Sequence, residues 1–319
     1  MRDIKNISVA VCGGAGFLGS HLVDHLINDR GCDVLVLDNL ISGKEKHIHE
    51  RAKFKWFDIR DSGDELVKIL VEHGFKFLFN YAAEPYIPEC FERPKHFFDI
   101  NAVAVLNVLE ASKKAGVEAI LQVSSAEIYG KATGKISEAE PVEPHSTYGV
   151  AKAAADSLVQ VRYREAGIPA IAMRQFNCVG ERETHEYVIP EIISQIHSEI
   201  MRNDCSTVRI KLGNNSVRDF QYAGDAVRQA VLLLENGQFG EVYNMGSEDC
   251  IEIYDLAVKI GELMDVNLFV TTDESRVRPW EIWHLQSDNT KLRGVIGEQV
   301  TTPLEEALKR TIAYFHANG

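Results

Sequence analysis

The order of apolar and polar residues predicts strands and helices that alternate along the first half of the chain. Short, continuous apolar runs, which are typical of buried parallel strands, cover residues 7–12, 33–38, 53–57, 75–81, 119–123 and 170–176. Apolar residues at helical spacing lie between these runs and predict helices over 17–29, 65–73, 94–116 and 147–166. The alternation predicts an α/β protein with a doubly wound parallel sheet, whose ligands lie at the carboxyl ends of the strands.

The pattern becomes less regular after Glu181. It predicts helices over 188–201, 225–235, 253–264 and 304–315, and strands over 208–212, 219–222 and 242–245. We expect residues 181–319 to form mainly a smaller C-terminal α/β lobe. Because no long linker separates it from residues 1–180, we expect the two parts to pack as one unit.

A glycine-rich turn follows the first predicted strand. It reads either Gly14-x-Gly16-x-x-Gly19 or Gly13-x-x-Gly16-x-x-Gly19. Both spacings allow a tight turn that a pyrophosphate can approach, with the N–H groups of the next helix facing it. Asp38, at the end of the second strand, lies where an acid reaches the hydroxyls of an adenosine ribose. These features favour a Rossmann-type dinucleotide site over a glycine turn without a ligand.

Composition narrows the class of partner. The 319 residues are 45% hydrophobic and 25% charged, as in ordinary globular proteins, and the formal net charge is −13. This charge disfavours nucleic acid or an anionic membrane as the main partner. The sequence has no signal-peptide pattern and no apolar run near the roughly 20 residues of a membrane span. Six scattered cysteines without a C-x-x-C pair favour a reduced, cytoplasmic protein with buried thiols.

The histidines indicate no metal site. His21 and His25 lie four residues apart on a predicted helix, but no third ligand is suggested near them. We therefore expect them to be packing or surface residues. His47 and His49 lie in a polar stretch and are expected to face solvent.

A possible catalytic set follows the fifth strand. Tyr148 and Lys152 are four residues apart on one predicted helix face, and Ser125 ends the strand before it. A free tyrosine has a pKa near 10, but the charges of a lysine and a nicotinamide favour the phenolate. Ser125 would then hydrogen-bond the substrate hydroxyl that Tyr148 deprotonates, as in hydride transfer to a nicotinamide cofactor. The alternative is a solvated Tyr–Lys pair without a catalytic role. The dinucleotide motif earlier in the chain favours the catalytic interpretation over this alternative.

Together these motifs resemble the extended short-chain dehydrogenase/reductases, the family of nucleotide-sugar epimerases and dehydratases. The matching segments run in family order through nearly the whole chain: 13–19, 38–40, 58–61, 81–83, 124–130, 148–152, 174–177, 217–220, 276–279 and 288–291. The resemblance implies NAD as cofactor, a nucleotide sugar as substrate and a homodimer as the assembly.

The resemblance also implies residue roles. The cofactor residues would be Gly13, Gly16, Phe17, Leu18, Asp38, Asn39, Asp58, Ile59, Ala82, Ala83, Tyr148 and Lys152. The catalytic residues would be Ser125, Tyr148, Lys152 and Glu127. The nucleotide sugar would contact Glu84, Asn177, Val188, Arg218 and Arg278, whose arginines suit its diphosphate.

Two departures bear on the reaction. Asn80 stands where the family often has His, as in the GDP-mannose dehydratase branch. Ala126 stands where typical sugar dehydratases carry the acid that acts on the C6 hydroxyl, although Glu127 resembles their glutamate. We therefore predict oxidation of a UDP-, GDP-, dTDP- or CDP-sugar at C4 and favour 4-epimerisation. The alternatives are 4,6-dehydration, decarboxylation, C4 dehydrogenation and, more remotely, non-catalytic NAD-dependent regulation.

Overall fold

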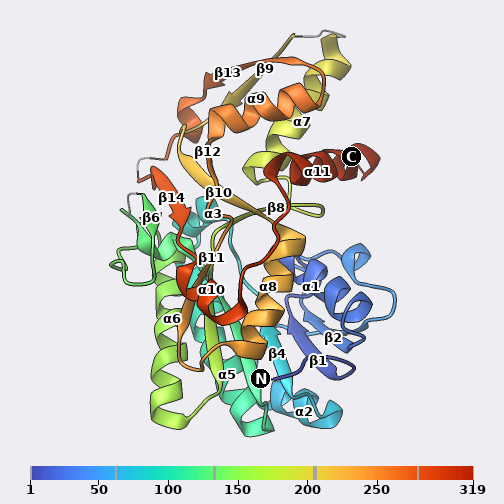
Figure 1. Cartoon of the computed structure of the whole chain (residues 1–319), viewed down its shortest axis with the longest axis vertical. Coiled ribbons are helices and arrows are strands. Elements are labelled where there is room, and N and C mark those ends of the chain that lie inside the picture. Colours follow the sequence, from blue (N-terminus) through green and yellow to red (C-terminus); the bar gives the residue numbers. More distant parts are fainter. Residues whose placement is uncertain (1, 62, 132–133, 204–206, 279, 319) are drawn as a thin grey trace.

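A parallel seven-stranded sheet forms the lower part of the molecule as drawn in Figure 1. The computed structural model describes residues 2–61, 63–131, 134–203, 207–278 and 280–318. In spatial order the strands are β11 (Val242–Met245), β7 (Ala170–Gln175), β5 (Ala119–Ser125), β4 (Phe77–Asn80), β1 (Ser8–Cys12), β2 (Asp33–Asp38) and β3 (Lys53–Trp56). The predicted doubly wound α/β sheet is confirmed, and the apolar runs of the first half account for every strand except β11.

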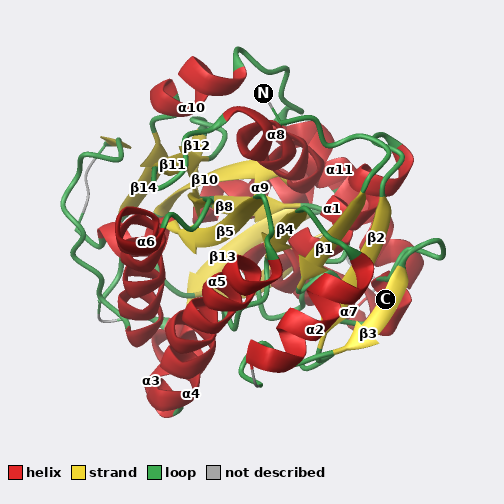
Figure 2. Ribbon diagram, turned by 90° about the horizontal axis from the view of Figure 1, so that it is seen from below, coloured by secondary structure: helices red, strands yellow, loops and turns green. Residues whose placement is uncertain are grey.

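Helices cover both faces of this sheet (Figure 2). One face carries α2 (Gly63–His73), α5 (Ala104–Ala115) and α6 (Thr147–Ala166), and the other carries α1 (Phe17–Asn28), α8 (Ala223–Asn236) and α10 (Thr290–Ile296). Leu35 and Leu37 of β2 face the first layer, whereas Val34 and Val36 face the second. Burial on both faces explains why these strands are apolar throughout rather than alternating.

The predicted helix over 94–116 is not a uniform α-helix. It consists of α4 (Pro94–Phe98), a π-helical turn (Asp99–Val103) and α5, and a short helix that was not predicted, α3 (Ile87–Glu92), precedes it. In the wide turn, Asn101 Nδ2 donates to the carbonyl oxygens of Phe97 and Glu84, both at 3.0 Å. The turn therefore fixes the loop that follows β4, which is one wall of the candidate site.

The upper part in Figure 1 is a smaller α/β lobe. One of its sheets runs β12 (Cys250–Glu252), β10 (Val217–Tyr222), β14 (His284–Ser287) and β6 (Lys135–Ile136), and β8 (Asn177–Val179) also pairs with β10. A second sheet pairs β9 (Thr207–Leu212) with β13 (Asn267–Thr272), and α7 (Val188–Asn203), α9 (Ile253–Leu263) and α11 (Leu304–Asn318) share its core. Most of the strands missed from the sequence are here, because runs of two to six residues carry too little pattern.

The two parts are joined by a buried carboxylate. Asp219 of β10 is fully buried and accepts hydrogen bonds from the main-chain N–H groups of Ser247, Glu248 and Ser287. These residues follow β11 of the large sheet and lie in β14 of the lobe. The chain thus returns to the first sheet after residue 181, since α8 packs on α1 and β11 pairs with β7.

Cysteine burial and helix length test two further expectations. Cys12, Cys32, Cys90 and Cys178 are buried and unpaired, but Cys250 is exposed, which corrects the expectation for that thiol; Cys205 lies outside the described residues. In the described ranges, no helix is both long and apolar enough to cross a membrane.

Candidate active site

Contacts inside the protein shape the glycine-rich turn between β1 and α1. Gly13 has a φ of 76°, and a Cβ there would lie 2.5 Å from the main-chain nitrogen of Ala82. A Cβ on Gly19 would lie 1.9 Å from the carbonyl oxygen of Gly13, so α1 can approach the turn only without a side chain at this position. Gly16 precedes the helix in extended conformation, and no side chain caps the helix. The first N–H groups of α1, from Phe17 and Leu18 onward, thus fit a pyrophosphate.

Asp38 ends β2 directly beside this turn. Its carboxylate is buried and accepts hydrogen bonds from the main-chain N–H groups of Ala15 at 3.0 Å and Leu40 at 2.8 Å. Burial raises the pKa of Asp38, and these two hydrogen bonds oppose the shift. Each carboxylate oxygen of Asp38 can still accept a further hydrogen bond. A Cβ on Gly43 would come within 2.8 Å of this carboxylate. The missing side chain at Gly43 keeps the space beside the carboxylate free, which fits the hydroxyls of an adenosine ribose.

The residues expected around adenine lie beyond β3. Asp58 accepts from Asn39 Nδ2 at 3.0 Å and forms an ion pair with Arg60 at 2.6 Å, which holds the pKa of Asp58 well below its usual range. The side chain of Ile59 is buried in the core, so only its main chain can contact a ligand. Arg60 was not among the expected residues; it belongs to this cluster through its contact with Asp58.

The structure brings Ser125, Tyr148 and Lys152 together at the carboxyl end of β5. Ser146 caps α6 by accepting from the N–H of Gly149 at 3.0 Å, which places Tyr148 in the first turn of the helix. Lys152 Nζ lies 5.8 Å from the centre of the Tyr148 ring and donates to the carbonyl oxygen of Val123 at 3.0 Å. The Tyr148 phenol shares a hydrogen bond with Ser125. All three side chains are largely or fully buried.

Burial controls the protonation of this set. It raises the pKa of Tyr148 above its ordinary value, while the hydrogen bond with Ser125 acts in the opposite direction. Burial lowers the pKa of Lys152 to about 8. At neutral pH the phenol is therefore neutral and the ammonium is charged. A further positive charge beside the phenol would favour its ionisation, so the site suits a base that becomes active when a cationic cofactor is bound.

Ala126 and Glu127 begin a 3₁₀ turn after Ser125. Ser125 Oγ accepts from the N–H of Glu127 at 3.2 Å, and Ala126 is only 1% exposed. Burial raises the pKa of Glu127, and the charges of Arg218 and Arg278 partly offset this. The carboxyl group of Glu127 therefore lies on the side of the site where the two arginines are found.

The two arginines differ in their partners. Arg218 of β10 is 7% exposed, and it donates to the carboxylate of Glu281 at 2.6 Å and to the carbonyl oxygen of Ile282 at 2.7 Å. Arg278 is held through its main-chain N–H, which donates to Asn214 Oδ1 at 2.7 Å, and its side chain forms no ion pair within the described part of the chain. The charge of Arg278 is thus available to an anion, whereas that of Arg218 is partly neutralised.

The other expected substrate residues come from the loop after β4, from β8 and from the start of α7. Glu84 follows Ala82 and Ala83 in the loop after β4; its carboxylate is 3.9 Å from His96 Nε2, and burial raises its pKa. Asn177 begins β8, and its buried Oδ1 has no hydrogen-bond partner among the described residues. Val188 is the first residue of α7 and packs against the core of the lobe.

Three residues were missed or misjudged from the sequence. Glu281 forms an ion pair with Arg218 from a segment that is distant in sequence, so no local pattern predicts this contact. Tyr187 lies next to Val188, its ring centre is 6.2 Å from that of Tyr86, and burial raises its pKa. His47 was expected to face solvent, which is wrong. It is half-buried, and its Nε2 is 3.4 Å from the Tyr314 hydroxyl.

Comparison with known proteins agrees with this geometry. The family model described as "NAD dependent epimerase/dehydratase family" matches residues 9–246. dTDP-D-glucose 4,6-dehydratase from Homo sapiens is 29% identical over 324 residues, which cover 97% of this chain and 90% of the relative. UDP-glucose 4-epimerase from Lacticaseibacillus casei is 32% identical over 259 residues, which cover 76% of each protein.

A solved structure extends the comparison to the fold. The crystal structure of UDP-glucose 4-epimerase with UDP-glucose from Thermotoga maritima superposes with a TM-score of 0.89. It is 28% identical in sequence, and the alignment covers 98% of this chain and 99% of that one. The uncapped turn after β1, the carboxylate of Asp38 and the Ser125–Tyr148–Lys152 set are compatible with NAD and its hydride chemistry. The chain belongs to the NAD-dependent epimerase/dehydratase family and is an NAD-dependent enzyme of that kind.

Proposed function

We propose that the enzyme acts on a nucleotide sugar by oxidising the sugar at C4, and that its product is the C4 epimer. The observation that carries the choice of epimer is Ala126. This residue follows Ser125 directly, is 1% exposed and offers no acid for a leaving hydroxyl. Inversion at C4 needs only the base, the hydride acceptor and enough room for the sugar to rotate in the site.

The proposed chemistry assigns one task to each buried side chain. NAD, when bound, supplies the hydride acceptor. The Tyr148 phenol takes the proton of the C4 hydroxyl, Ser125 hydrogen-bonds that hydroxyl, and the Lys152 ammonium stabilises the phenolate. Because these groups are nearly inaccessible to water, their charges act in a low-dielectric environment.

For the substrate we propose a nucleoside diphosphate sugar, with UDP-sugars as the first to test. Arg278 carries an uncompensated charge, and Arg218 presents the rest of its guanidinium from β10; both suit a diphosphate. Asn177 has a buried amide oxygen without a described hydrogen-bond partner, and we include Glu84 and Val188 among the substrate residues. The Thermotoga maritima relative was crystallised with UDP-glucose, which supports this order of testing.

Dehydration is the second candidate, and Glu127 favours it. Loss of water across C5–C6 needs a base for the C5 proton, and Glu127 is a carboxylate close to the catalytic set. The human relative is a dTDP-D-glucose 4,6-dehydratase. Dehydration also needs an acid at the C6 hydroxyl, and Ala126 cannot supply one.

Product mass separates the two outcomes. We would incubate the enzyme and NAD with a panel of UDP-, dTDP-, GDP- and CDP-sugars and analyse the products by mass spectrometry and NMR. Unchanged mass with inverted C4 is the expected result. A product lighter than the substrate by one water would identify the reaction as dehydration instead of epimerisation. A product lighter by two hydrogens would indicate a released keto sugar. Tyr148→Phe is the matched control, because it removes the base and keeps the ring.

We also propose a cytoplasmic homodimer in which residues 1–180 bind NAD and residues 181–319 mainly hold the substrate. The dimer is supported by apolar side chains that the single chain leaves uncovered on the α4–α6 side. Phe98 is 37%, Val103 48% and Val150 45% exposed. A pair of helices from each copy would bury these side chains about a twofold axis.

A further inference from the structure

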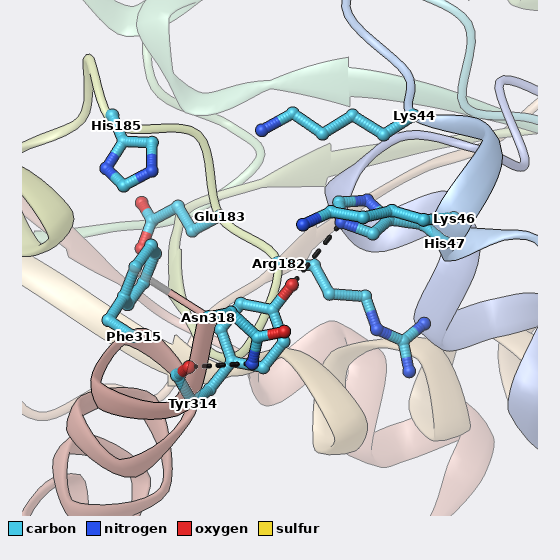
Figure 3. A pocket seen from close by; sticks show the side chains of 9 residues that line it. All are labelled: Lys44, Lys46, His47, Arg182, Glu183, His185, Tyr314, Phe315 and Asn318. Atoms are coloured by element: carbon cyan, nitrogen blue, oxygen red, sulfur yellow. Dashed lines mark hydrogen bonds between the residues drawn. The ribbon is translucent and has the colours of Figure 1, made fainter.

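A pocket lined by several basic side chains contains none of the residues assigned to the catalytic set (Figure 3). Three segments that are distant in sequence form it: residues 44–47 after β2, residues 182–185 before α7, and the end of α11. In Figure 3 the ammonium groups of Lys44 and Lys46 extend over it, with Glu183 and His185 opposite and Tyr314 below.

Two of the three cations of this pocket have no acidic partner among the described residues. Neither Lys44 nor Lys46 forms an ion pair with any described residue. Arg182 forms an ion pair with Asp24 through Nη2, but its Nη1 is buried without a hydrogen-bond partner. The pKa of His47 is lowered to about 4, chiefly by burial and then by these three cations. The pocket therefore has two lysine ammonium groups without a described ion pair and one Arg182 N–H donor without a described partner.

The one acid in the pocket does not balance these charges either. Glu183 is 7% exposed, and its Oε2 has no hydrogen-bond partner within the described residues. Burial raises the pKa of Glu183 well above its usual value, which favours the protonated form. A protonated carboxyl is a hydrogen-bond donor, and here that donor lines a basic pocket.

We propose that this pocket is a phosphate site, separate from the pyrophosphate turn, in which the ammonium groups of Lys44 and Lys46 and the side chains of Arg182 and Glu183 surround a phosphate dianion. The site takes free inorganic phosphate or the phosphate of a small monoester. The proposal does not depend on which sugar the enzyme converts.

A bound phosphate would also act on the cofactor turn. The N–H of Lys44 donates to the carbonyl oxygen of Ala15 at 3.0 Å, and Ala15 in turn donates to Asp38. The Tyr314 hydroxyl of α11 meets His47 from the opposite side. Phosphate would therefore join the turn that holds NAD to the C-terminal helix, and phosphate and NAD would strengthen each other's binding by the same factor.

The test is calorimetric titration of inorganic phosphate into enzyme saturated with NAD, with chloride at matched ionic strength as the blank. One phosphate per chain should bind. In Lys44→Ala/Lys46→Ala the affinity should fall about tenfold or more, because two charge-assisted contacts are lost. The control is Lys68→Ala/Lys113→Ala, which removes two exposed lysines without a recorded ion pair and changes the net charge equally. This variant should bind phosphate as the unaltered enzyme does.

Four results would overturn the proposal. No heat above the chloride blank at millimolar phosphate would show that there is no site. Displacement of phosphate by NAD would place phosphate in the pyrophosphate turn instead. An equal loss of affinity in the control variant would show general attraction rather than a site. Finally, NADP that excludes free phosphate and binds more tightly than NAD would show that the lysines serve the 2′-phosphate of a cofactor.

Discussion

Replacing Lys152 by methionine should remove activity and yet stabilise the NAD-free protein. Lys152 is 2% exposed, and its Nζ has a single described hydrogen bond, to the carbonyl oxygen of Val123. No carboxylate in the described part of the chain pairs with its charge, and burial lowers the pKa of Lys152. Methionine keeps the unbranched apolar stem and removes the ammonium group.

The pKa shift sets the size of this effect. Folding lowers the pKa of Lys152 from 10.5 to about 8. At 1.36 kcal/mol per pKa unit, the charged form destabilises the folded state by about 3 kcal/mol. The lost hydrogen bond to Val123 offsets roughly 1 kcal/mol of the gain. Lys152→Met should therefore raise the free energy of unfolding by about 2 kcal/mol at pH 7.

The effect has a defined pH dependence. Between pH 8 and 10.5 the unfolded chain binds the Lys152 proton and the folded chain does not, so the stability of the unaltered protein rises with pH in this window. The advantage of Lys152→Met should be complete below pH 8 and should disappear towards pH 10.5.

Urea unfolding of both proteins without NAD, at equal protein concentration and at several pH values, measures this difference. Lys68→Met, at an exposed lysine, is the control and should change stability by no more than about 0.5 kcal/mol. The reasoning fails if Lys152→Met is less stable than the unaltered protein at pH 7, or if its advantage persists undiminished at pH 10.5.

Three further outcomes are expected. Asp38→Ala should narrow a strong preference for NAD over NADP, since the carboxylate that repels a 2′-phosphate is gone; equal affinities in the unaltered enzyme, by calorimetry, would contradict this. Tyr148→Phe should lower turnover about 10²–10⁴-fold and leave NAD binding nearly intact, as measured by steady-state kinetics and titration; retained turnover would remove Tyr148 as the base. Val150→Glu places a charge on the proposed dimer face and should shift a dimer to monomers in sedimentation; an unaltered protein that is monomeric at micromolar concentration would refute the interface.

The ion pair between Arg218 and Glu281 bears on substrate affinity. A diphosphate that reaches Arg218 meets a guanidinium already paired at 2.6 Å, whereas Arg278 has no such partner in the described chain. Arg278 therefore carries more of the unsatisfied positive charge at this end of the site. This asymmetry follows from packing between β10 and the segment before β14.

Local patterns were sufficient for the sheet and for the cofactor turn. The second apolar run, over 33–38, is β2, and the helix predicted over 147–166 is α6 to the residue. Strands buried on both faces are apolar without interruption, and caps such as Ser146 act within one turn, so neighbouring residues contain the information. Gly13, Asp38, Tyr148 and Lys152 could be found for the same reason, since each belongs to a motif of short spacing.

The charges that surround these motifs were decided only by the tertiary structure. Glu281 neutralises Arg218, His47 is half-buried beside Tyr314, and Lys44 faces Glu183 across a pocket made by three distant segments. The strand β11 joins the first sheet from beyond residue 181, and short strands such as β8 form only because β10 pairs with them. Burial shifts the pKa values of Tyr148, Lys152 and Glu183. It depends on all the elements packed around a side chain, and these are distant in sequence, so no local pattern predicts it.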